Sequence, residues 1–167
     1  ATKVRSMTDI VYIQPLTAAS FAPFGDVIEA SGHPHRLINA GMCRRFDDCA
    51  QLSFADGRAG ISVFDAKVRK LPMTLDLMER HPDGSQAFLP MTQNPFLVVV
   101  ASDEDGVPGR PVAFETQPGQ GVNYHRNVWH GVLAPLHEPG LFAVVDRVGA
   151  GTNLEEHRFA HEITIMK

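Results

Sequence analysis

The sequence is short of cysteine and has no long apolar run, and each shortage excludes a class of protein. Its two cysteines, Cys43 and Cys49, are too few for the disulfide framework of a small secreted domain. We therefore expect two free thiols in a reducing cytoplasm. The longest apolar stretch, Pro95–Ala101, is far too short to cross a bilayer. The opening residues contain charges and no apolar signal-peptide segment, which also favours a cytoplasmic location.

Basic residues are likewise scattered. The net charge is −4, and no block of lysine or arginine occurs along the chain. Nucleic acids and anionic membranes attract proteins through a concentrated basic face, so we expect neither of them as a partner. Hydrophobic residues make up 44% and charged residues 20% of the sequence, which is typical of a folded globular protein.

Proline and glycine are plentiful, and they divide the chain into short segments. A length of 167 residues suffices for one core and is too small for two ordinary domains, so residues 1–167 are predicted to form a single domain. Several segments between the turns alternate with period two, as β-strands do. The predicted strands are Ile10–Ile13, Asp26–Glu29, Gly60–Val68, Ala87–Pro90, Phe96–Ala101, Val112–Glu115, Gly121–His125, Gly131–Ala134 and Leu141–Val148.

Helices are few in this pattern. A short one is predicted over Ala18–Phe21, because Thr17 can cap it and Pro23 can end it. Leu71–Arg80 fits either a helix or extended chain. Phe96–Val100 is apolar throughout, which predicts cover on both of its faces. The pattern therefore predicts a mainly β protein, an antiparallel barrel or sandwich with few short helices.

The segment from Glu79 to Pro90 combines a turn with reactive side chains. Glu79 and His81 lie two residues apart, so on an extended strand they project from the same face. Residues 82–84 form a Pro-Asp-Gly turn, and Gln86 begins the returning strand. Taken alone, His81 is more often an exposed turn residue than a metal ligand.

A second segment, Pro118–Gly131, combines a glycine-rich turn with Tyr124, His125, Arg126, Trp129 and His130. If Glu79 and His81 converge with these histidines, they form a nitrogen and oxygen site suited to a borderline divalent cation. They could equally form a metal-free set of general acids and bases. Taken singly, Trp129 is more often a packing residue and Arg126 a partner in an ion pair. The density of such residues in both segments favours a site.

Two further arginines are candidates for binding a carboxylate. Arg147 follows Asp146 at the end of an apolar run, and Arg45 follows the Asn39-Ala40-Gly41 turn. A guanidinium can grip a carboxylate with two parallel hydrogen bonds. The remaining histidines stand in polar stretches and are interpreted as solvated; they are His33, His35, His137, His157 and His161.

Over nearly its whole length the chain resembles the ureidoglycolate lyase (ureidoglycolate hydrolase) family of allantoin degradation. The Glu79–Pro82 and Tyr124–His130 motifs are the most specific parts of the resemblance. The other matching segments are Pro15–Thr17, Phe21–Ile28, Ile38-Asn39 with Gly41, Arg45-Phe46, Gly84–Pro90, Gly121–Asn123 and Asp146-Arg147. One departure is visible, since Asp47 stands where the family commonly has histidine.

The resemblance implies a cupin-like β-barrel, a homodimer and the cleavage of ureidoglycolate to glyoxylate and urea in purine catabolism. It also implies a divalent metal, nickel being suggested, near His81, His130 and Gln86. A glutamine in place of the usual acid makes the site less anionic, so a metal-free site stays open.

The reaction assigns roles to the candidates as a hypothesis. Arg126 or Arg147 would bind the substrate carboxylate, with Asn39 and Arg45 as further substrate-binding candidates. His125 or Glu79 would act as the base, and His130 or Tyr124 as the acid.

Three alternatives remain at this point. The first is an amidohydrolase acting on ureidoglycolate and releasing ammonia and carbon dioxide. The second is a different metal-dependent cupin enzyme, although such sites usually contain a fuller His-x-His and Glu set. The third is a non-catalytic cupin that binds a small carboxylic acid.

Overall fold

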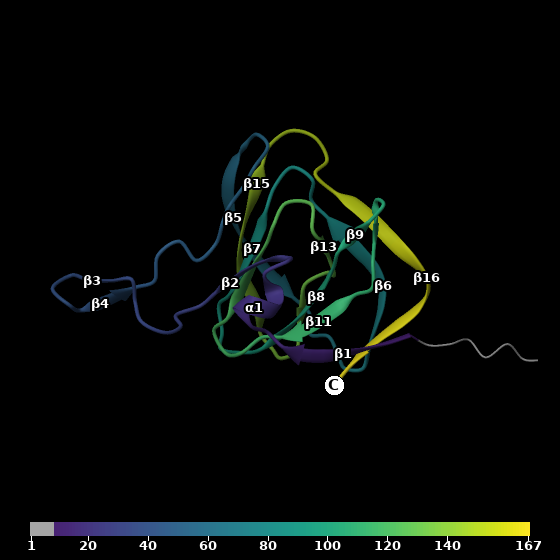
Figure 1. Cartoon of the computed structure of the whole chain (residues 1–167), viewed down its shortest axis with the longest axis horizontal. Helices are drawn as coiled ribbons and strands as arrows, with labels where there is room; N and C mark the ends of the chain where they lie inside the picture. The colour runs from purple at the N-terminus through teal and green to yellow at the C-terminus, as the bar shows by residue number, and fades with distance from the viewer. Residues whose placement is uncertain (1–8) are drawn as a thin grey trace, which may run out of the picture.

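The computed structural model describes residues 9–167 and consists mainly of β-strands (Figure 1). The opening segment, on which the predicted cytoplasmic location partly depends, lies outside these residues. Among those described, no helix is long and apolar enough to cross a membrane. The elements are β1 Asp9–Pro15, α1 Ala18–Phe21, β2 Gly25–Ile28, β3 Arg36–Ile38, β4 Cys43–Arg45, β5 Arg58–Ala66, β6 Met73–Arg80, β7 Gln86–Pro90, β8 Phe96–Ala101, β9 Asp103–Glu104, β10 Val107–Pro108, β11 Val112–Glu115, β12 Gly121–Tyr124, β13 Trp129–His130, β14 Ala134–Pro135, β15 Gly140–Val148 and β16 Glu155–Met166.

The predicted helix is confirmed. Thr17 has an extended backbone and accepts a hydrogen bond from the Ser20 amide, while the Ser20 hydroxyl lies 3.3 Å from the Thr17 amide. This reciprocal pair satisfies two amides that a helix start leaves without partners.

One strand prediction needs correction, one long strand was missed, and one ambiguity is resolved. Leu71–Arg80 is extended as β6. The predicted strand Gly131–Ala134 is wrong over most of its length, because β13 ends at His130 and β14 begins only at Ala134. The long strand β16 was not predicted. Its register against β6 shifts between Arg158 and Ile163, and this irregularity breaks the alternation that marks a strand.

Six strands close into a barrel in the order β11-β1-β16-β6-β13-β8, with β8 returning to β11. Strand β1 runs parallel to β11 and to β16, while the other described pairings are antiparallel. The barrel thus joins the two ends of the described chain. Its interior is an apolar cluster that includes Met78, Val99, Trp129 and Ile165.

A five-stranded sheet in the order β2-β12-β7-β15-β5 packs against one side of this barrel. A second core fills the layer between them, with Phe96 and Phe142 meeting edge to face at 4.9 Å. Strand β8 contributes alternate residues to the two cores, Val98 to this layer and Val99 to the barrel interior. The prediction that Phe96–Val100 is covered on both faces is therefore confirmed. The cupin-like, mainly β fold is confirmed as well.

A hairpin of β3 and β4 stands away from these layers (Figure 1). The barrel strands β6 and β16 lie on the far side of the five-stranded sheet from it. The face of that sheet toward the barrel is called here the inner face, and the opposite one the outer face.

Candidate active site

Glu79, His81 and His130 form a cluster in the layer between the barrel and the five-stranded sheet. One ligand atom of each lies within 4.8 Å of the others. Glu79, one residue before the end of β6, faces His130 of β13 in the antiparallel register, so their side chains share a face of the barrel wall. His81 follows in the turn toward β7, and its ring centroid is 5.1 Å from that of His130. The predicted convergence of the two histidine-containing segments is thus present.

Backbone carbonyls orient both imidazoles. The Nδ1 atom of His81 lies 2.8 Å from the Asn153 carbonyl, and Nδ1 of His130 lies 2.9 Å from the Gly131 carbonyl. Because a carbonyl can only accept, each Nδ1 must donate, which leaves the lone pair of a neutral ring on Nε2. Both Nε2 atoms are buried without a hydrogen-bond partner. The site therefore presents two oriented, unused lone pairs.

Burial keeps His130 neutral. Its desolvation, together with the nearby His81, lowers the pKa of His130 to about 3, against a smaller opposing effect of the Gly131 carbonyl. The ring of Tyr124 stacks on it with centroids 4.3 Å apart. Burial, and then the charge of Glu79, raises the pKa of Tyr124, so its hydroxyl keeps its proton. At neutral pH, His130 offers a lone pair and Tyr124 offers a proton.

The carboxyl group of Glu79 is more basic than usual. Desolvation raises the pKa of Glu79; nearby His81 lowers it, Glu156 raises it further, and the net shift is upward. Glu156 is opposite Glu79 in the pairing of β16 with β6, which explains the like-charge effect. A carboxylate with a raised pKa is a better general base.

Gln86 projects from the inner face of β7, opposite Tyr124 in register. Its amide nitrogen donates to Asp146 at 3.1 Å. Since an ionised carboxylate only accepts, this bond identifies the other atom as the carbonyl oxygen, and that oxygen is buried without a partner. Gln86 is thus positioned beside Tyr124 with one acceptor available.

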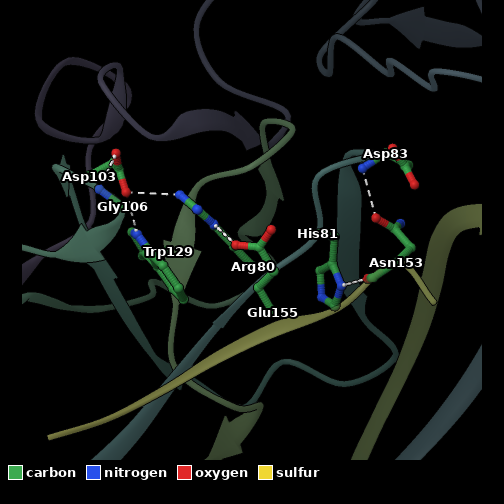
Figure 2. Close-up of polar contacts among 8 residues, drawn as sticks. All are labelled: Arg80, His81, Asp83, Asp103, Gly106, Trp129, Asn153 and Glu155. Carbon is green, nitrogen blue, oxygen red and sulfur yellow. Dashed lines mark hydrogen bonds and ion pairs between the residues drawn. The ribbon is translucent and has the colours of Figure 1, made fainter.

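A network on the barrel side holds the strands that carry the cluster (Figure 2). Arg80 bonds Glu155 at 2.7 Å and Asp103 at 2.8 Å, and its guanidinium lies 4.4 Å from the Trp129 ring centroid. The Trp129 indole also donates to Asp103 at 2.9 Å. These contacts tie the residue between Glu79 and His81 to the neighbour of His130.

Asn153, in the loop between β15 and β16, makes two contacts with the turn that carries His81. Its side-chain oxygen accepts from the Asp83 amide at 2.7 Å, while its carbonyl accepts from His81 (Figure 2). Sequence reasoning overlooked Asn153 and Arg80. For Arg80 a signal existed, because strand alternation directs it away from the face shared by Glu79 and His81.

His125 lies on the other side of β12. Tyr124 faces the inner layer, and the next side chain points outward, where His125 Nε2 lies 3.0 Å from the Asp26 carboxylate. Burial disfavours ionisation of Asp26, but bonds from the Gln51 amide, Asn123 and His125 outweigh it and lower the pKa of Asp26. The structure therefore brings three of the predicted catalytic residues together, Glu79, Tyr124 and His130, and separates His125 from them.

The two arginines favoured for the substrate carboxylate have different surroundings. Arg126 is exposed and donates to the Pro82 carbonyl, in the turn that follows His81. Arg147 is on the outer face, ion-paired with Asp56 and with only 4% of its side chain exposed. It packs against Gly84, where an added Cβ would come within 2.9 Å of the Arg147 side chain. Of the two, Arg126 is next to the cluster's turn and has an exposed guanidinium.

Asn39 and Arg45 belong to the projecting hairpin. Asn39 is at its tip with φ of 54°, and Arg45 pairs with Asp47 at 2.6 Å. Asp47 also accepts two bonds from Arg36; these bonds and the charge of Arg45 lower its pKa. Asp47 stands where the resembling family commonly has histidine, and here it organises arginines. Within one described chain, neither Asn39 nor Arg45 is part of the cluster.

A sequence model of the family described as ureidoglycolate lyase matches residues 8–166. The chain is 65% identical over 146 residues to a ureidoglycolate lyase of Rhodobacter capsulatus, a match that covers 87% of this chain and 91% of that one. It is 54% identical over 149 residues to a ureidoglycolate lyase 2 of Rhizobium meliloti, covering 88% and 91%. A ureidoglycolate lyase of Pseudomonas entomophila is 48% identical over 153 residues, covering 90% and 92%.

Among solved structures, a dTDP sugar isomerase from Desulfovibrio desulfuricans aligns over 83% of each chain. Its TM-score is 0.39 and its sequence identity is 17%, a likeness too distant to bear on function.

Proposed function

The chain belongs to the ureidoglycolate lyase family, and we propose that it cleaves ureidoglycolate to glyoxylate and urea at the cluster of Glu79, His81 and His130. The observation that carries this assignment is the pair of buried, unpartnered Nε2 atoms beside a carboxylate of raised pKa. Leaving such groups without partners in a core is costly, so their arrangement points to a ligand or reactant. Ureidoglycolate is the proposed substrate because the chain belongs to this family.

The donor set fits a divalent metal. Histidines that bind metals usually donate their other ring nitrogen to a carbonyl or carboxylate, as His81 and His130 do. Imidazole nitrogens with a nearby carboxylate suit a borderline ion, and Ni²⁺ is the first one to test. We propose that the two histidines hold it. When bound, such an ion would stabilise negative charge on the substrate hydroxyl oxygen.

The reaction transfers one proton from the substrate hydroxyl to the ureido nitrogen. The hydroxyl loses its proton as the C=O bond of glyoxylate forms, and the C–N bond breaks with its electron pair passing to nitrogen. Glu79 accepts the hydroxyl proton and returns it to that nitrogen, which completes urea and restores the carboxylate. His130 cannot supply this proton, since its pKa of about 3 leaves it neutral near pH 7.

The remaining residues hold the substrate. The Tyr124 hydroxyl donates a hydrogen bond to the ureido carbonyl oxygen, and the Gln86 carbonyl oxygen accepts one from the ureido N–H. Gln86, predicted as a metal ligand, thus takes a substrate-binding role in this proposal. Arg126 binds the carboxylate from the exposed turn region. Arg147 keeps Gly84 and its turn in place from the outer face, and His125 orients Asp26.

We also propose the wider setting. The reaction is a late step in recovering nitrogen from purines through allantoin, and the enzyme works in the cytoplasm. Residues 1–167 form one domain, and two chains form a homodimer.

A product assay tests the activity. Purified protein incubated with racemic ureidoglycolate should release glyoxylate and urea in equal amounts. Treatment with a chelator should lower the amount of both products, and addition of Ni²⁺ should restore it. Ammonia in place of urea would indicate an amidohydrolase. Saturable binding of glyoxylate without turnover would indicate a small-acid-binding cupin, and other products a different cupin enzyme.

A further inference from the structure

The hairpin of β3 and β4 has two unlike faces. Arg36 and Arg45 are opposite each other in register, and both pair with the one carboxylate of Asp47, so this face is polar. Leu37 and Arg44 are opposite each other on the second face, where the side chain of Leu37 is 63% exposed. The tip adds Met42, which is 87% exposed. An isolated two-stranded hairpin is marginal in water, so an uncovered apolar face calls for a partner surface.

The outer face of the five-stranded sheet is a second uncovered apolar surface. Because Phe142, Val144 and Phe88 point into the inner core, the alternate residues of β15, β7 and β5 point outward. On the edge strand β5, Ile61 is 77% and Val63 is 64% exposed. Their outward neighbours are Ala143 and Val145 of β15 and Leu89 of β7. An apolar sheet face of this kind is typical of an interface.

We propose that the arm, residues 30–48 with the β3–β4 hairpin, covers the outer sheet face of a second copy of this chain. The inference rests on the homodimer proposed above and assigns its contact surface. Leu37 and Met42 of one copy would pack on Ile61 and Val63 of the other, in both directions about a two-fold axis.

Position within the fold supports this occupant. The arm leaves the body at the end of β2, and returns at Gln51, whose amide binds Asp26 on the outer face at 2.8 Å. Both ends of the arm thus lie at the β2 edge of the sheet, and β5 is the opposite edge. In Figure 1 the arm extends from the side of the sheet that faces away from the barrel. With two outer faces opposed about an axis along the strands, the β2 edge of one copy lies over the β5 edge of the other.

Charge supports the same pairing. Residues 30–48 contain three arginines and two aspartates, so the arm has an excess of positive charge. Arg44 shares the apolar face of the arm with Leu37. On β5, the outward row of Ile61 and Val63 ends in Asp65, which is exposed. In the proposed dimer, the apolar residues of the arm and the neighbouring Arg44 therefore meet the apolar row of β5 and the neighbouring Asp65.

The mass of the full chain in solution tests the surface. Sedimentation should give the wild-type protein a mass of twice 18.3 kDa. Val63→Glu on β5 and Met42→Glu on the arm should each sediment as monomers with an unchanged circular dichroism spectrum. Val107→Glu is the matched control, because Val107 is 44% exposed on the β9–β10 hairpin, away from both surfaces; it should stay dimeric.

A charge exchange tests the register. Arg44→Asp and Asp65→Arg should each raise the dimer dissociation constant by about five-fold, and the double variant should recover most of the loss. Wild-type protein that sediments as a monomer would overturn both the homodimer and its surface. A dimer that survives both glutamate substitutions would overturn the surface alone. Urea release, measured separately on wild-type protein, decides the catalytic proposal, because the outer face does not contain the cluster.

Discussion

The ring of Tyr124 lies flat against the ring of His130, with 3° between their planes. One stands on the five-stranded sheet and the other in the barrel wall, so the stack joins the two layers at the proposed reaction centre. Phe21 and Phe88 also pack around Tyr124, with ring centroids 6.2 and 5.8 Å away. The orientation of His130 therefore depends on a ring as well as on a hydrogen bond.

Tyr124→Phe should separate these two contributions. The ring and its stack remain, so affinity for the metal should be unchanged. Loss of one hydrogen bond to the reacting substrate should lower kcat by about ten-fold. Steady-state urea release and a metal titration measure the two effects. Tyr124→Leu, which removes the stack, should weaken metal binding as well; equal metal affinity in the leucine variant would contradict the orienting role.

His130→Ala should abolish Ni²⁺ binding and lower kcat/KM by at least about 100-fold, since even residues behind a metal ligand contribute 10- to 100-fold. His125→Ala is the matched control. Its ring lies with Asp26 on the far side of β12, so most activity and all metal binding should persist. Calorimetric titration and the urea assay report both properties. If the His125 variant were as inactive as the His130 variant, the cluster would not be the whole site.

Arg80→Ala should reduce both stability and metal affinity. It removes the stack on Trp129 and leaves Asp103 and Glu155 without their cation. A loss of about 1–2 kcal/mol in unfolding free energy is expected, given the usual strength of a partly desolvated cation–π contact. Urea denaturation measures it. Arg158→Ala is the control, because its pair with Asp76 is long and both side chains are more than 70% exposed; it should change stability by less than about 0.5 kcal/mol.

Arg80→Lys keeps the charge but not the planar fork. If Arg80 positions the cluster, this variant should recover most of the stability and only part of the Ni²⁺ affinity. Full recovery of both would reduce the role of Arg80 to charge alone.

The rate should fall in acid with the titration of Glu79. Its raised pKa places the loss of the base above 4.5, the ordinary value for this carboxyl group. As pH drops through the folded-state pKa, the carboxylate is protonated and kcat/KM declines. The measurement is kcat/KM against pH for wild type and Glu79→Gln. The glutamine variant should be slow at every pH, and its kcat/KM should not decline further in acid. If both proteins showed the same decline in acid, the titrating group would be a residue other than Glu79.

The two-residue spacing of Glu79 and His81 and the motif ending at His130 were enough to predict that these side chains converge. The same alternation, carried one residue past Tyr124, would have directed His125 outward. Applied after Val144 and Asp146, it would have put Arg147 on the outer face. The pairing of β16 was harder to predict, because its register shift interrupts the pattern. Nothing local indicates that the hairpin of β3 and β4 leaves the body.

Strand β8 separates the barrel interior from the layer that holds the cluster. Val98 and Val100 line the layer that holds the cluster, Leu97 and Val99 line the barrel interior, and Val100 pairs directly with His130. Close-packed cores transmit small changes in volume. A methyl group gained or lost at Val99 should therefore shift the packing around His130 on the other face of the strand, although Val99 does not contact the substrate. We therefore expect substitutions at the barrel-facing positions of β8 to alter activity at the cluster.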